Sequence, residues 1–402
     1  MLTEHEFEAP VDHGHPNGPK LTVFAREVVA LGHEADDLPW LVFFQGGPGF
    51  EAARPLKPGN PTFLERALEE YRVLLLDQRG TGRSSPVGEL EEMSPAEQAD
   101  YLARFRADAI VLDAELIRRE LGVEHWSILG QSFGGFCVTR YLSAAPDGLA
   151  EAFLTGGLPP LDRHPDDVYR ATYRRVLERN RAYYERYADD QERVRRIIER
   201  LERDDVRLPS GDRLTPRRFR QLGIMLGQAD GFERLHYLIE LPYGSPAFLH
   251  DVEASFPFAR NPLYAVIHEA SYAAQGATGW SADRVMPDEL RDDQTLFTGE
   301  HVYPWMFEEY VALRPLAEAA RILAEREWPQ FYDRERLSRS DVSAAAAIYT
   351  EDMYVERAYS EETAKAIRGL RPWITSEYEH DGLRADGARV FGKLIDLVRG
   401  RA

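Results

Sequence analysis

The pentapeptide G-Q-S-F-G at residues 130–134 constrains the fold of this chain more than any other feature. An apolar segment, W-S-I-L, precedes it, and an apolar stretch of helical character continues to Leu142. The pattern G-x-S-x-G is typical of a serine on a sharp strand-to-helix turn, where its hydroxyl projects above a sheet. Glycines two positions either side remove side chains that would collide with neighbouring backbone. We therefore expect Ser132 to be a nucleophile, with the N–H of Phe133 beside it as an oxyanion donor.

Apolar segments elsewhere in the chain predict the sheet to which this turn belongs. The segments that we expect to be strands are residues 21–29, 39–44, 72–77, 126–129, 152–157, 342–349 and 371–378. Apolar residues recur at helical spacing over residues 101–121 and again over residues 385–399. Strands that alternate with helices indicate an α/β fold in which helices flank both faces of a mostly parallel sheet.

The character of the sequence changes after the strand expected at residues 152–157. The following segment is rich in Arg, Glu and Tyr, has helical periods, and contains no convincing buried strand. Its charge runs, such as residues 192–205, are typical of solvated helix faces. We expect a helical cap over residues 159–325, inserted between two parts of one core, residues 1–158 and 326–402.

Composition excludes several classes of function. The chain has 402 residues and a formal net charge of -19, which disfavours nucleic acid and anionic membranes as partners. Its single cysteine, Cys137, allows neither an internal disulfide nor a cysteine-based zinc site. The first residues lack the pattern of a signal peptide, and no segment is long and apolar enough to span a membrane. We expect a cytoplasmic protein that does not bind membranes, and a monomer is the expectation for its assembly.

Three motifs together resemble the proline iminopeptidase family of α/β-hydrolases. They are Q-G-G-P-G at residues 45–49, D-Q-R-G-T-G-R-S at residues 77–84, and G-Q-S-F-G-G at residues 130–135. The family commonly has histidine where this chain has Gln45. The resemblance implies the α/β-hydrolase fold with a large helical cap after the sixth strand, and a serine peptidase that needs no metal or organic cofactor. It is strong over residues 40–157, patchy over the insertion, and visible again near Asp352 and His380.

The first two motifs are expected to shape the site. Glycine lets the backbone approach a substrate carbonyl closely, and the resemblance implies an oxyanion donor in the pair Gly46 and Gly47. A plain glycine-rich turn is the alternative interpretation. The second motif is expected to be structural, through hydrogen bonds from Arg79.

The other members of a catalytic triad are expected to follow the serine in the order acid, then histidine. Of the six later histidines, only His380 lies beyond the insertion, directly after the last expected strand. Asp352 follows the preceding strand and matches the position of the family's catalytic acid. We expect Ser132 to attack, His380 to transfer the proton, and Asp352 to orient the imidazole.

An aminopeptidase must hold a charged terminal amine, which carboxylates above the nucleophile would do. The resemblance points to Glu269 and Glu300, which both lie among aromatic residues of the insertion. Tyr303 and Trp305 are candidates to line a slot for a proline ring, although aromatic residues in a helical cap more often pack together.

The leading hypothesis is a serine aminopeptidase that releases an N-terminal residue, preferentially proline, from a small peptide with a free N-terminus, through an acyl-enzyme. One alternative is an esterase or amidase of the same fold that acts on uncharged acyl groups. Another is a non-catalytic binding protein, because a fold alone does not determine function.

Overall fold

Eight strands form one sheet in the computed structural model, which describes residues 1–57, 59–88 and 90–401. The strands are β1 (Leu2–Pro10), β2 (Lys20–Val28), β3 (Trp40–Phe44), β4 (Arg72–Leu76), β5 (Trp126–Gln131), β6 (Leu149–Thr155), β7 (Ser343–Tyr349) and β8 (Leu370–Thr375). Their order in the sheet is β1-β2-β4-β3-β5-β6-β7-β8. The pairs β1·β2 and β2·β4 are antiparallel and the other pairs are parallel, so the sheet is mostly parallel, as expected.

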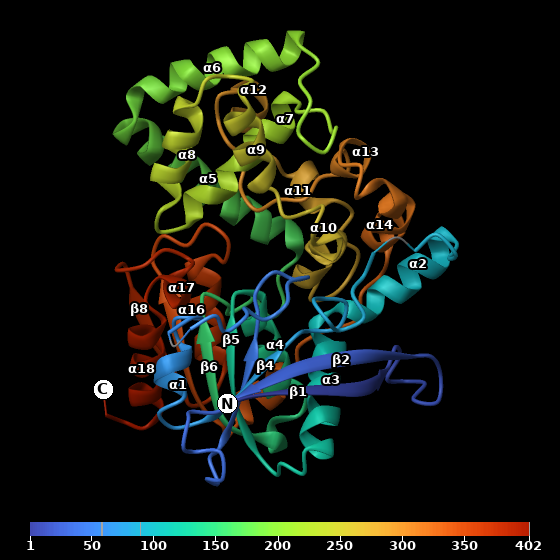
Figure 1. Ribbon diagram of the computed structural model, residues 1–402, viewed down its shortest axis with the longest axis vertical. Coiled ribbons are helices and arrows are strands. Elements are labelled where there is room, and N and C mark those ends of the chain that lie inside the picture. The colour runs from blue at the N-terminus through green and yellow to red at the C-terminus, as the bar shows by residue number, and fades with distance from the viewer. Residues whose placement is uncertain (58, 89, 402) are drawn as a thin grey trace.

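The central strands are buried on both faces, which explains their continuous apolar runs. Along β3, Leu41 and Phe43 join the core on one face, whereas Val42 and Phe44 join the core on the other. Helices α1 (Leu64–Ala67) and α18 (Gly387–Val398) cover the first face, and α3 (Ala107–Glu120) and α4 (Phe133–Ala144) cover the second (Figure 1). The remaining core elements are α2 (Pro95–Leu102), η1 (Ala103–Phe105), η2 (Pro146–Gly148), α16 (Arg357–Ala366) and α17 (Gly382–Ala385).

Two expectations from the sequence were incomplete. Strand β1 was not predicted, because only its later residues are buried and the rest of this edge strand alternates between exposed and partly exposed positions. The helix expected over residues 101–121 is interrupted by η1 and by extended backbone at Arg106 (φ -78°, ψ 172°). The guanidinium of Arg106 lies 4.2 Å from the ring of Trp328 and donates to the carbonyl of Ala273 (2.7 Å). These contacts of the buried Arg106 stabilise the interruption of the helix. The spacing of apolar residues does not reveal such an interruption.

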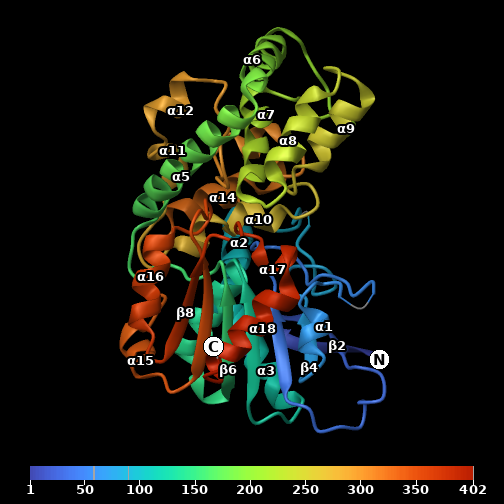
Figure 2. The same ribbon diagram turned by 90° about the vertical axis from the view of Figure 1, so that its left-hand side faces the viewer.

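Helices fill the chain between β6 and β7. They are α5 (Pro165–Arg186), α6 (Ala188–Arg203), α7 (Pro216–Arg220), η3 (Gln221–Gly227), α8 (Gly231–Glu240), α9 (Pro246–Ala254), α10 (Pro262–Ile267), η4 (Glu269–Tyr272), α11 (Ser281–Arg284), α12 (Asp288–Asp292), α13 (Met306–Glu309), η5 (Arg314–Leu316), α14 (Ala317–Glu325) and α15 (Arg334–Arg339). In both views α6, α7 and α12 lie far from the sheet, and α10 lies between them and the core (Figures 1 and 2). None of the helices in the described part of the chain is long and apolar enough to cross a membrane.

Candidate active site

Ser132 occupies a strained turn between β5 and α4. Its backbone has φ 55° and ψ -124°, a conformation that non-glycine residues rarely adopt. The flanking glycines are required by contact, because a Cβ on Gly130 would collide with the carbonyl of Gly134, and one on Gly134 would collide with the carbonyl of Phe44. Strain of this kind persists only where the surrounding structure enforces it, which is typical of functional sites.

The structure brings Ser132, His380 and Asp352 together from three separate loops. The Nε2 atom of His380 lies 2.9 Å from the Oγ of Ser132, and its Nδ1 lies 2.7 Å from the Oδ2 of Asp352. The other oxygen of Asp352 accepts from the backbone N–H groups of Tyr354 (2.8 Å) and Val355 (2.9 Å). These bonds orient the carboxylate so that it accepts the Nδ1 proton, which leaves Nε2 facing the serine hydroxyl.

The pKa of His380 is raised above its usual 6.5. Burial of the ring opposes the protonated form, but the charge of Asp352 and its hydrogen bond to the ring outweigh that effect, and Glu300 adds to it. The ring of Tyr354 packs edge-on against the imidazole, at 4.6 Å between centroids. A histidine whose protonated form is stabilised in this way is suited to accept a proton from the serine.

The expected oxyanion donors surround the serine. Gly46 and Gly47 line a cavity with Ser132, and a Cβ on Gly46 would lie 2.9 Å from the Cβ of Ser132. The side chain of Gln78 holds this loop by donating to the carbonyl of Gln45 (2.9 Å). Phe133 is the first residue of α4, so its N–H has no acceptor within the helix.

Arg79 has the structural role expected of it. Its buried guanidinium bonds to Asp113 (2.6 Å from Nε to Oδ2) and donates to the carbonyls of Pro10, Val11 and Arg104. These contacts join the end of β1 to the segment between α2 and α3.

A cavity of about 540 Å³ opens above the serine. Core and insertion both contribute to its walls. The lining residues that matter for the chemistry are Gly46, Gly47, Ser132, His380, Tyr264 and Glu300, and those farther along it include Gln228, Arg234, Asp381 and Arg384. A volume of this size is typical of small-ligand sites.

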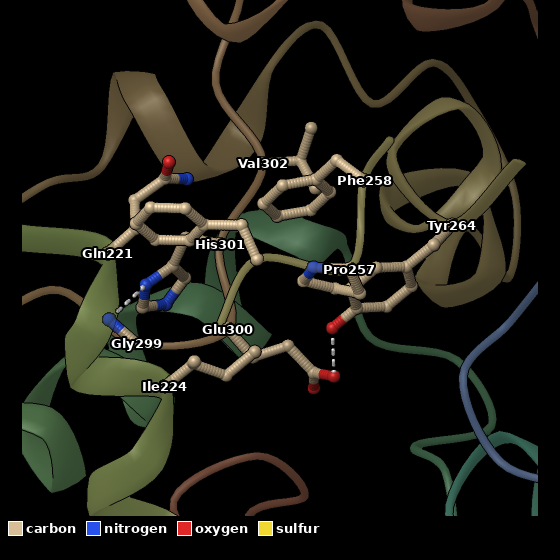
Figure 3. Close-up of a pocket in the computed structure, with 10 residues that line it drawn as sticks. Gln221, Ile224, Pro257, Phe258, Tyr264, Gly299, Glu300, His301 and Val302 are labelled. Carbon is tan, nitrogen blue, oxygen red and sulfur yellow. Dashed lines mark hydrogen bonds between the residues drawn. The ribbon is translucent and has the colours of Figure 1, made fainter. Parts of the chain in front are cut away.

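Glu300 is the acidic residue of the insertion that lines this cavity. Figure 3 shows its carboxylate turned away from the apolar side chains of Pro257, Phe258 and Val302, with the hydroxyl of Tyr264 directed at it. Burial raises the pKa of Glu300 to about 7, against the opposing effects of the Tyr264 hydrogen bond and of His380. An anion in so poorly solvated a place favours a cationic partner.

Glu269, Tyr303 and Trp305 lie elsewhere. None of the three is among the described residues that line a cavity with Ser132. The carboxylate of Glu269 accepts from the backbone N–H of Ala282 (3.0 Å), and burial raises its pKa. Tyr303 stacks on Trp305 at 5.8 Å, and its hydroxyl lies 3.1 Å from that of Tyr173. These side chains hold the insertion together.

Several lining residues were not predicted from the sequence. Tyr264 lies in an apolar helical segment that resembles core, and Tyr354 lies in a loop after β7. Three further lining residues are polar and belong to surface helices or loops: Gln228, Arg234 and Arg384. Nothing in the sequence around them indicates that they line a cavity. In the described ranges, no group of three or more His, Cys, Asp or Glu side chains is arranged to hold a metal ion.

Known proteins resemble this chain over nearly its whole length. A family model described as alpha/beta hydrolase fold matches residues 39–247. A proline iminopeptidase of Aeromonas sobria is 48% identical over 98% of this chain and 96% of its own length. The chain belongs to the proline iminopeptidase family of α/β-hydrolases. A second proline iminopeptidase, from Aspergillus aculeatus, is 35% identical over 99% of the chain and 94% of its own length.

The similarity to these two proline iminopeptidases extends through the helical insertion as well as the core, because it spans nearly the whole chain. Membership confirms the resemblance that the three motifs indicated. Among solved structures, a 2-hydroxy-6-oxo-6-phenylhexa-2,4-dienoate hydrolase from Rhodococcus covers 99% of the chain and 100% of its own, with a TM-score of 0.48 and 16% identity.

Proposed function

We propose that this chain is a serine aminopeptidase that releases N-terminal proline from peptides, with Ser132 as its nucleophile. One observation carries the proposal: a serine hydrogen-bonded to a histidine–aspartate pair shares its cavity with the carboxylate of Glu300. The pair supplies hydrolytic chemistry, and the carboxylate supplies the means to recognise a terminal amine. The two full-length relatives are named as proline iminopeptidases, which supports proline as the released residue.

The reaction begins with attack of the Ser132 Oγ on the carbonyl carbon of the first residue, while His380 Nε2 takes the hydroxyl proton. The oxyanion accepts hydrogen bonds from the N–H of Phe133 and from the Gly46–Gly47 loop. The C–N bond then breaks as His380 gives the proton to the leaving amine, and the acyl-enzyme forms. Water, deprotonated by His380, attacks the ester, and the residue leaves as Ser132 regains its proton.

Glu300 selects the substrate by charge. The protonated imino group of proline carries two N–H groups, and the ionised carboxylate accepts hydrogen bonds from them. The segment 159–325 acts as a cap in this proposal, since it contributes Glu300 and Tyr264 to the cavity above a serine that belongs to the core. Substrate selection thus depends on the insertion and bond cleavage on the core.

Two arylamides that differ only at the amine test the proposal. The enzyme is expected to hydrolyse prolyl-arylamide and to leave N-acetyl-prolyl-arylamide intact, because acetylation removes the charge that Glu300 binds. An esterase or amidase for uncharged acyl groups would prefer the acetylated compound, and a binding protein would cleave neither. Either result would overturn the proposal.

A further inference from the structure

The cavity above Ser132 has a second charged region, formed by Arg234 and Arg384. Both line the cavity, and both donate to one neutral atom, the Oε1 of Gln228, at 2.8 Å and 3.1 Å respectively. Two guanidinium groups thus point their N–H donors at one place, the amide oxygen of Gln228. A carboxylate in that place would accept from both.

The partners of the two arginines leave donors available. Arg384 bonds to Asp381 at 2.6 Å, and its side chain is 60% exposed. The acid paired with Arg234 is Asp230, 3.6 Å away and itself 64% exposed. Each guanidinium has five N–H donors, so these contacts and Gln228 do not saturate them.

The cavity is lined by charged groups of both signs. Ser132 and His380 are buried, whereas the side chains of Arg234 and Arg384 are 45% and 60% exposed. The cavity therefore presents a carboxylate and two guanidinium groups to a ligand that reaches Ser132. A short peptide has the complementary charges, because its terminal amine is positive and its terminal carboxylate negative.

We propose that Arg234 and Arg384 bind the terminal carboxylate of the leaving peptide, so that the enzyme prefers short peptides with a free C-terminus. This inference rests on the proposed function, since it takes the amine to be held at Glu300. A cavity of about 540 Å³ is of the size that holds a small ligand. A longer chain would carry its carboxylate beyond the arginines and gain nothing from them.

The test compares prolyl-alanyl-alanine with its C-terminal amide. The wild type is expected to show a kcat/KM about tenfold higher for the free acid, as two partly exposed charge contacts can provide. The double variant Arg234→Gln, Arg384→Gln should reduce that ratio to about one. The double variant Arg234→Lys, Arg384→Lys should keep part of it, because the charge remains. Arg321→Gln, on the exposed face of α14, is the control that keeps the full ratio.

The ratio of acid to amide cleavage is measured within each variant. If loss of the Arg384–Asp381 ion pair reduces activity in general, both substrates are affected equally and the ratio is unchanged. Equal cleavage of acid and amide by the wild type would overturn the inference and leave the proposed function intact. A full ratio in the glutamine variant would overturn it too. Failure of the wild type to release proline from either peptide and from prolyl-arylamide would instead overturn the proposed function.

Discussion

Glu300 and Ser132 line the same two cavities, although Glu300 belongs to the helical insertion and Ser132 follows strand β5 of the core. Glu300 also helps to raise the pKa of His380, and His380 helps to lower that of Glu300. A substrate amine that neutralises Glu300 weakens this mutual effect. If the amine binds at Glu300 as proposed, binding should lower the pKa of His380 and increase the fraction of neutral imidazole next to the serine.

The pH dependence of kcat/KM should show that two groups, His380 and Glu300, must be deprotonated for activity. In the free enzyme both His380 and Glu300 must lose a proton before a cationic substrate reacts. The pKa of Glu300 is about 7, and that of His380 is raised above 6.5. On the acid side, kcat/KM for prolyl-arylamide is expected to fall about a hundredfold per pH unit, against about tenfold for an uncharged ester. Glu300→Gln should reduce the steep limb to about tenfold. A tenfold limb for both substrates in the wild type would contradict this account.

Substitution of the two glutamates should separate their roles. Glu300→Gln keeps an acceptor for Tyr264 but removes the charge, so kcat/KM for prolyl-arylamide should fall about a hundredfold. Glu269→Gln is the matched control, since the pKa of Glu269 is also raised but its carboxylate accepts from the backbone of Ala282. It should change kcat/KM less than about threefold. Steady-state kinetics measure both, and an equal loss in the two variants would count against Glu300 as the amine site.

Glu300→Gln should also stabilise the fold above neutral pH. The pKa of Glu300 is about 7 in the fold and near 4.5 in the unfolded chain, so the unfolded chain loses its proton first as pH rises. The resulting penalty is absent below pH 4.5, grows between these values, and is complete above pH 7. Urea unfolding should show Glu300→Gln to be more stable by about 3 kcal/mol at pH 8 and unchanged near pH 4. The control is Glu308→Gln, on an exposed side chain, and a difference that did not vary with pH would contradict the assignment.

The loop at Gly46 tolerates no side chain. A Cβ there would lie 2.6 Å from the Oε1 of Gln131 and 2.9 Å from the Cβ of Ser132, so Gly46→Ala must displace the oxyanion donors or the serine. We expect kcat to fall about a hundredfold or more while KM changes little. Gly88→Ala is the control, because a Cβ there meets nothing within 4 Å. Unchanged kcat in Gly46→Ala would exclude this loop from the oxyanion site.

Local pattern was sufficient to predict the turn at Ser132, since the glycines and the apolar flanks record steric requirements within a few residues. The central strands were predictable because burial on both faces requires continuous apolar runs. Their order along the chain also led to Asp352 and His380, which lie within hydrogen-bonding distance of each other and, through His380, of Ser132.

Tertiary contacts decide the features that the sequence does not reveal. Glu269 and Glu300 each adjoin a histidine and lie among aromatic residues, so their sequence environments are alike, yet only Glu300 lines the cavity of Ser132. Tyr264 resembles any core residue of an apolar helix. The convergence of Arg234 and Arg384 depends on how α8 of the insertion approaches α17 of the core, which no local pattern encodes.

Hydrolysis of prolyl-arylamide by the wild type, Ser132→Ala and Ser127→Ala tests the central claim most directly. Ser127 lies in the same strand, β5, and its substitution should leave the rate within about threefold of the wild type. Ser132→Ala should lower kcat/KM by about 10⁴-fold or more, with a thermal midpoint no lower than that of the wild type. Turnover by Ser132→Ala at a rate near that of Ser127→Ala would contradict the account.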